Sequence, residues 1–112
     1  MVINVFEQYF SAAAKVNGAE RRAALVMLIS DSEAGQIRYT AAVTFFPHRD
    51  EEDYAVSYDA YEEEVLFSGK GRRSKKREAK MLLGFNKMID RISERINGKV
   101  FWDKPLRDAQ RG

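Results

Sequence analysis

Two apolar segments joined by a short turn limit the possible folds of this chain more than any other part of its sequence. Every residue of 23–29 is apolar, and 37–46 alternates apolar or aromatic side chains with mainly polar ones. Between them, 30–35 is rich in the serine, aspartate and glycine that favour turns. Alternation with a period of two is typical of a strand with one buried face. We therefore predict a β-hairpin over 23–46, although leucine and methionine leave a helix open for 22–30.

The segments that flank this hairpin predict one further helix and one further strand. From Val5 onward, apolar side chains recur every three or four residues, and an Asn-Gly pair of the kind that ends helices follows. We therefore predict a helix over 3–16. A third strand is predicted from the alternation that begins at Tyr54 and, after three glutamates, from the apolar residues 65–67.

The carboxy-terminal half contains a second amphipathic helix. Ser74 is a residue type that caps helix N-termini, the apolar side chains from Leu82 to Ile96 share one face, and another Asn-Gly pair follows. These signals predict a helix over 74–96 and a tail over 97–112.

Together these elements predict an α+β fold. The expected arrangement is a two-layer α-β-β-β-α order, in which a three-stranded antiparallel sheet over 22–68 carries both helices packed on one face. At 112 residues the chain is long enough for one core of ordinary size, so we expect a single domain over 1–112.

Composition argues against several functional classes. The chain has no cysteine, which removes disulfides, cysteine zinc sites and thiol catalysis, and a cytoplasmic location is expected. The apolar run 23–29 is too short to span a membrane, and Glu7 stands where a secretory signal would be basic and then apolar. The single histidine, His48, follows a proline in a predicted loop, with no catalytic partner indicated. We therefore expect no enzyme, metal site, cofactor or membrane association.

Charge is distributed unevenly along the chain. The net charge is only +2, but 50–64 holds eight acidic residues and no basic one, whereas 70–111 holds 14 basic and five acidic residues. Six of the eight residues in 70–77 are cationic, at the predicted start of a helix where the macrodipole is already positive. Such an end favours a bound anion. A solvated charge cluster that serves only solubility is the alternative.

Residues 69–71 (Gly-Lys-Gly) and 76–80 (Lys-Arg-Glu-Ala-Lys) lie where the third strand is predicted to end and the last helix to begin. They resemble the carboxy-terminal signature of double-stranded RNA-binding domains, which places glycines before a helix that starts K-K-x-A-K. The resemblance implies an α-β-β-β-α order and contacts from Lys76, Arg77 and Lys80 to phosphates across the major groove of duplex RNA. The predicted hairpin loop lacks the Gly-Pro-x-His of that family.

Two sets of charged side chains are the candidate binding sites. The first hypothesis is a nucleic-acid-binding module, with duplex RNA preferred over DNA, that contacts phosphates through its basic helix end and helix face. Its candidate residues are Lys70, Arg72, Arg73, Lys75, Lys76, Arg77, Lys80 and Lys87. The alternative is a small protein-interaction or inhibitor protein whose acidic loop patch docks on a basic protein surface. Its candidate residues are Asp50, Glu51, Glu52, Asp53, Glu62, Glu63 and Glu64. A homodimer that joins the acidic end of one copy to the basic flank of another is a third hypothesis.

Overall fold

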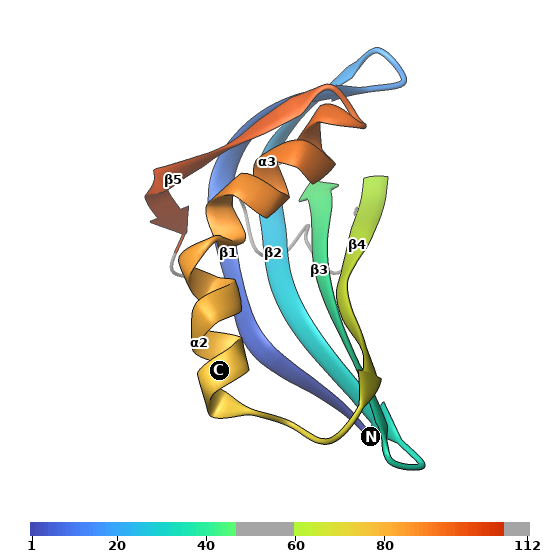
Figure 1. Cartoon of the computed structure of the whole chain (residues 1–112). Helices are drawn as coiled ribbons and strands as arrows, with labels where there is room; N and C mark the ends of the chain where they lie inside the picture. Colours follow the sequence, from blue (N-terminus) through green and yellow to red (C-terminus); the bar gives the residue numbers. More distant parts are fainter. Residues whose placement is uncertain (47–59, 107–112) are drawn as a thin grey trace.

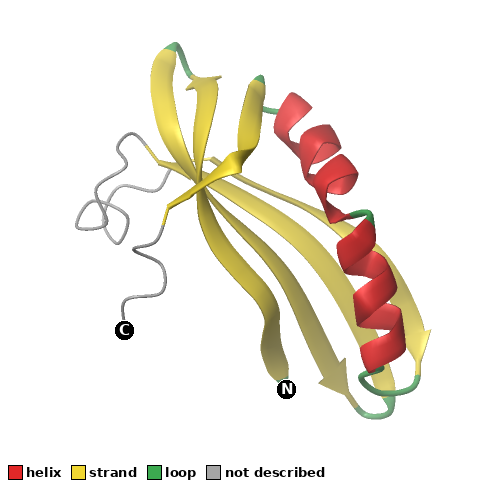
Figure 2. Cartoon of the chain, turned by 90° about the vertical axis from the view of Figure 1, so that its left-hand side faces the viewer, coloured by secondary structure: helices red, strands yellow, loops and turns green. Residues whose placement is uncertain are grey.

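A computed structural model describes residues 1–46 and 60–106, and in it one curved antiparallel sheet carries two helices on the same face (Figure 1, Figure 2). The helices are α2 (Lys75–Leu83) and α3 (Phe85–Glu94). The strands are β1 (Val2–Val16), β2 (Ala19–Glu33), β3 (Gln36–Phe46), β4 (Ala60–Lys70) and β5 (Gly98–Leu106). They are ordered β4-β3-β2-β1-β5 across the sheet, and every neighbouring pair is antiparallel.

Two tight turns join the first three strands. Asn17 and Gly18 have φ angles of 52° and 81°, and Ala34 and Gly35 have φ angles of 54° and 79°. Two central residues with positive φ are the mark of type I′ turns, whose twist matches that of antiparallel strands. The chain therefore runs from β1 to β3 as a continuous meander.

Strands β2 and β3 form the predicted hairpin, which is confirmed together with the assignment of 22–30 to a strand. Alternate side chains of both strands face the helices and are fully buried, among them Val26, Leu28, Tyr39 and Val43. The buried face of α3 packs on them through Phe85, Ile89 and Ile92. The centre of the core thus lies between β2, β3 and α3.

The amino-terminal segment is strand β1, so the predicted helix over 3–16 is wrong. The pairing of β1 with β2 has an extra residue in β1 at two points, near Val5 and near Ala12. These bulges interrupt the period of two. Because of the first bulge, the adjacent residues Val5 and Phe6 both pack against the core under the helices, and Tyr9 packs on the opposite face of the sheet, which is also apolar. The resulting apolar spacing imitates that of a helix.

The predicted three-stranded, α-β-β-β-α arrangement is also wrong, because the sheet has five strands. β1 stands in place of the first helix, and β5 is formed by residues that were predicted as part of the tail 97–112. The glutamates at 62–64 do not interrupt a strand, since they lie within β4. Tyr54, where the third strand was predicted to begin, lies outside the described residues, as does His48.

The predicted helix over 74–96 is divided at Gly84 into α2 and α3. Gly84 has φ −102° and ψ 10°, which is outside the helical region, and its N–H donates to the carbonyls of Leu82 and Met81. Neither helix of the described residues is long and apolar enough to cross a membrane.

Gly98, the first residue of β5, lies where β5 approaches β1 most closely. A Cβ atom at this position would lie 2.5 Å from Cβ of Ala14 and 3.2 Å from Cζ of Phe45. Both neighbours are buried. They are held by the sheet on which the helices pack, so an added methyl group has no space.

We predict that Gly98→Ala lowers the free energy of unfolding by about 1–3 kcal/mol, because the new methyl group overpacks the contact between β1 and β5. Urea denaturation measures this change. Gly84→Ala is the matched control, since its Cβ would meet only Cε of Met88 at 3.7 Å. If the two substitutions destabilise the protein equally, Gly98 is not required for the close approach of β5 to β1.

Candidate nucleic-acid interface

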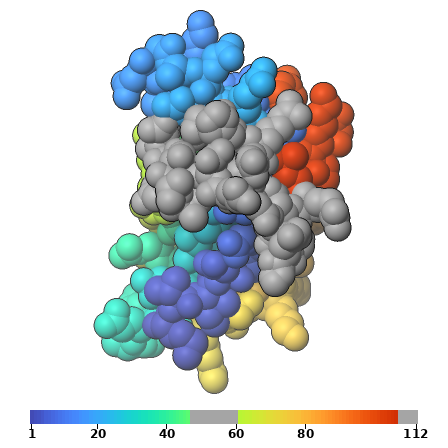
Figure 3. All heavy atoms as spheres, turned by 180° about the vertical axis from the view of Figure 1, so that it is seen from behind, coloured from blue at the N-terminus to red at the C-terminus, as the bar shows by residue number. Residues whose placement is uncertain are grey.

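The glycine loop and the start of α2 form one end of the molecule, beside the β2–β3 turn (Figure 1). The N–H of Gly71 donates to the carbonyl of Gly35 over 2.9 Å, which attaches the loop to the tip of that hairpin. Gly71 has a φ of 128°, a conformation that favours glycine. Seen from behind, the yellow segment that holds this loop and the start of α2 projects at the end opposite the β1–β2 turn (Figure 3).

A buried carboxylate, that of Glu78, attaches the first turn of α2 to the sheet. Its Oε2 accepts a hydrogen bond from the hydroxyl of Tyr39, a fully buried residue of β3, over 2.8 Å. Both of its oxygens accept hydrogen bonds from the guanidinium of Arg73, each over 2.8 Å. The Tyr39 hydroxyl in turn accepts from the backbone N–H of Ser74 over 3.2 Å. We refer to Tyr39, Arg73, Ser74 and Glu78 as the Glu78 cluster.

Hydrogen bonding and burial shift the pKa values of the Glu78 carboxyl and the Tyr39 hydroxyl, and the bond to Glu78 raises the pKa of Arg73. The bonds from Arg73 lower the pKa of the Glu78 carboxyl, against the opposing effect of burial, and the bond from Tyr39 lowers it further. Burial raises the pKa of the Tyr39 hydroxyl, although the bond from the Ser74 N–H acts in the other direction. At neutral pH the carboxylate is therefore charged and the phenol neutral, as the hydrogen bonds require.

Ser74 and Arg77 complete the start of α2. The predicted cap at Ser74 is confirmed, because its hydroxyl accepts a hydrogen bond from the backbone N–H of Arg77 over 3.2 Å. The guanidinium carbon of Arg77 lies 4.1 Å from the ring centroid of Phe67, a cation–π contact with the end of β4. Of the six cations in 70–77, two are thus held by side chains of the described part of the chain: Arg73 by Glu78 and Arg77 by Phe67.

The other cations at this end of the molecule are exposed, and none of them pairs with a carboxylate of the described residues. They are Lys70, Arg72, Lys75, Lys76 and Lys80, which we call the α2 cluster. Lys70 and Arg72 belong to the end of β4 and the loop, and the three others to α2. The charges of Lys70, Arg72, Lys75 and Lys76 lie at the N-terminal end of α2, where they add to the positive end of the helix dipole, whereas Lys80 lies in its last turn.

The predicted basic face does not continue along α3. Lys87 is exposed, but it follows the break at Gly84, and Asp90 lies one turn further along its helix. Arg91 is paired with Glu64, its Nη2 lying 2.6 Å from Oε2 of the carboxylate. The candidates of the loop and α2 therefore lie before the break at Gly84, and Lys87 lies after it, on α3.

The acidic candidates within β4 are partly used by α3. Glu62 and Glu64 are half-buried, and both pair with Arg95, over 3.9 Å and 3.4 Å. Glu63 is exposed, and its backbone carbonyl accepts a hydrogen bond from Arg95 over 3.0 Å. The four remaining acidic candidates, 50–53, lie outside the described residues.

Sequence reasoning assigned Arg73 to an external ligand and did not identify Tyr39 or Glu78 as parts of the site. Tyr39 was placed on the buried face of a strand, which is correct, but its hydroxyl partner is 39 residues away along the chain. The available signal was Glu78 itself, the only acidic residue in 70–80. A single carboxylate among so many cations indicates a specific internal partner.

Comparison of the chain with protein-family models, with curated proteins and with solved structures gives no match. The site is therefore interpreted from its own geometry. Within 1–46 and 60–106, no group of three or more histidine, aspartate or glutamate side chains is placed to hold a metal ion.

We predict that Glu78 makes stability depend on pH. Its pKa is lower in the folded than in the unfolded chain, so its contribution is fully present above the ordinary glutamate pKa of about 4.3 and is lost as the pH falls through the folded-state value. Glu78→Gln should therefore be less stable than the wild type at pH 7, by about 2 kcal/mol. This difference should shrink as the pH falls below about 4.

Urea denaturation over a pH series measures both effects. Glu94→Gln is the control, because Glu94 is an exposed carboxylate of α3 without an ion pair to the described residues. Its stability should follow that of the wild type at every pH. If the difference in free energy of unfolding between the wild type and Glu78→Gln stays constant down to low pH, the charge of Glu78 is not what stabilises the folded protein.

Proposed function

We propose that this protein binds nucleic acid, with duplex RNA as its preferred ligand, through phosphate contacts of the α2 cluster. The observation that carries the proposal is that none of these five cations forms an ion pair within 4 Å of a carboxylate of the described residues, although Lys75 lies near enough to Glu78 to act on its charge. The chain has 17 acidic residues for 19 basic ones, so internal neutralisation was available. It is used elsewhere, at Arg73, Arg91 and Arg95.

A polyanion is the ligand that this arrangement favours. Clustered lysines repel one another and the helix dipole, and a row of phosphates relieves both interactions. Each phosphate that is neutralised also releases condensed counterions, which is the main source of sequence-independent affinity for nucleic acid. The α2 cluster should therefore bind backbone phosphates rather than base edges.

The Glu78 cluster supports the proposal by positioning these cations. The bidentate pair between Arg73 and Glu78 and the bond from Tyr39 fix both the loop and the first turn of α2 on the sheet. The cations of the α2 cluster are thus presented from a rigid base. Less ordering is then required when the ligand binds, which favours affinity.

The preference for duplex RNA rests on the resemblance of 69–80 to the signature of double-stranded RNA-binding domains. Two of the three contacts that the resemblance implies, Lys76 and Lys80, are exposed. The third, Arg77, is stacked on Phe67. The α-β-β-β-α order that the resemblance also implied is not the order of this chain. The absence of cysteine agrees with a cytoplasmic location for this function.

Docking of an acidic patch on a basic protein has less support. The carboxylates of Glu62 and Glu64 already pair with Arg91 and Arg95, so much of their charge is neutralised within the molecule. The third hypothesis was a homodimer that joins the acidic end of one copy to the basic flank of another. It has less support for the same reason, because the internal pairing already neutralises part of the acidic charge.

We predict that Lys76→Gln with Lys80→Gln weakens binding to duplex RNA and lowers the salt dependence of the affinity. The slope of log K against log salt should fall in magnitude by about 2, because two phosphate contacts are removed. Fluorescence anisotropy of a labelled RNA duplex over a salt series measures both quantities.

Arg91→Gln with Arg95→Gln is the matched control. It removes the same charge, but from side chains that are paired with Glu64. Its affinity and salt slope should stay near those of the wild type. If both double variants lose affinity equally, net charge rather than the α2 cluster is responsible; if the wild type does not bind, the proposed function is wrong.

A further inference from the structure

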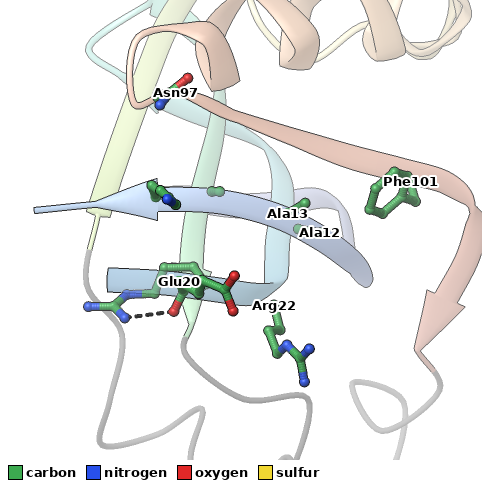
Figure 4. Close-up of a pocket in the computed structure, with 9 residues that line it drawn as sticks. Ala12, Ala13, Glu20, Arg22, Asn97 and Phe101 are labelled. Atoms are coloured by element: carbon green, nitrogen blue, oxygen red, sulfur yellow. Dashed lines mark hydrogen bonds between the residues drawn. The ribbon is translucent and has the colours of Figure 1, made fainter. Parts of the chain in front are cut away.

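A hollow of about 420 Å³ lies between the β1–β2 hairpin and the start of β5 (Figure 4). Its volume is in the range of small-ligand sites. Its walls include Ala12, Ala13, Glu20, Arg22, Asn97 and Phe101. The hollow shares no residue with the α2 cluster, so it is a separate site.

Irregular strand pairing opens this hollow. β1 has an extra residue near Ala12 in its pairing with β2. On the other side of β1, only Ser11 lies opposite the four residues 101–104 of β5, which are therefore unpaired. Bulges of this kind redirect side chains. Here Trp102 packs against the core, whereas Phe101 lines the hollow.

Phe101 is an aromatic ring surrounded by cations. The ammonium groups of Lys99 and Lys104 lie 6.0 Å and 5.5 Å from its ring centroid. Lys99 and Lys104 belong to β5 and approach the ring without lining the hollow, whereas Arg22 and Lys15 contribute cations to the wall itself; all four side chains are exposed. Among the described residues that line the hollow, Glu20 alone carries a carboxylate. The site therefore combines a half-buried π-face with an excess of positive charge.

These two elements are the ones that bind single-stranded nucleic acid. Bases that are not paired stack on aromatic side chains, while lysine and arginine follow the phosphates. A lysine that lies near a phenylalanine ring in the free protein is long and flexible enough to turn to a phosphate beside the stacked base. Bases inside a duplex are stacked on one another and do not present a free face to such a ring.

We propose that this hollow binds an unpaired nucleotide of an RNA strand, with its base stacked on Phe101 and its phosphate held by Lys99, Lys104 and Arg22. This proposal rests on the proposed function and adds that the RNA ligand has a single-stranded part. The α2 cluster then holds phosphates at one end of the molecule, and the hollow holds an unpaired nucleotide near the other.

The test compares two labelled RNA ligands, an oligouridylate of about ten nucleotides and a blunt duplex, by fluorescence anisotropy with the full chain. Phe101→Leu keeps an apolar side chain but removes the ring, and should weaken oligouridylate binding about tenfold. Phe101→Trp keeps a stacking surface and should retain the affinity. Neither substitution should change the affinity for the blunt duplex.

A second variant covers the case in which Phe101→Leu does not fold. Lys99→Gln with Lys104→Gln changes only exposed side chains. It should weaken oligouridylate binding and lower the magnitude of its salt slope by about 2. Thermal unfolding shows which variants are folded.

The outcomes separate this proposal from the one on which it rests. If the wild type binds the duplex but not the oligouridylate, or if every folded variant of the hollow binds the oligouridylate as the wild type does, the stacking site is overturned. The proposed function still stands in both cases if Lys76→Gln with Lys80→Gln weakens duplex binding. If the wild type binds neither ligand, both proposals are wrong.

Discussion

The hydrogen bonds among Tyr39, Arg73 and Glu78 hold the functional end of the molecule in place. Helix α2 buries only two of its residues, Glu78 and Met81, so apolar packing contributes little to its position. A charge buried without a partner would be costly, but here the carboxylate has a bidentate guanidinium and a phenol. The interaction is therefore specific in geometry, and α2 has one orientation on the sheet.

Arginine and lysine are used for different purposes in this protein. Around the two helices, the cations held by internal partners are arginines: Arg73 and Arg91 on carboxylates, Arg77 on an aromatic ring and Arg95 on a carbonyl and two carboxylates. The contacts of Lys99 and Lys104 with the Phe101 ring are longer than that of Arg77 with Phe67. The α2 cluster is lysine except for Arg72. A planar guanidinium suits fixed bidentate and stacked contacts, whereas an ammonium group is strongly hydrated and serves as a movable point charge. The division fits arginines that fix the two helices on the sheet and lysines that form an adaptable phosphate-binding surface.

Part of this structure was predictable from local sequence. The β2–β3 hairpin, the cap at Ser74 and the basic segment after β4 each follow from short-range patterns. β1 was mistaken for a helix because both of its faces carry apolar side chains and because its first bulge places two adjacent residues on the same face. β5 was missed because its residues form a strand only against β1, far away in sequence. The contact between Tyr39 and Glu78 was missed for the same reason.

The position of β5 at the edge beside β1 has a consequence for how the chain folds. The meander from β1 to β3 has tight turns and forms from neighbours, but β5 joins the sheet only after the chain has returned across both helices. Contacts that close so long a loop form slowly. During synthesis β1 emerges long before β5 and thus waits with one unpaired edge for that strand. In that interval, strand addition from another chain is the main hazard.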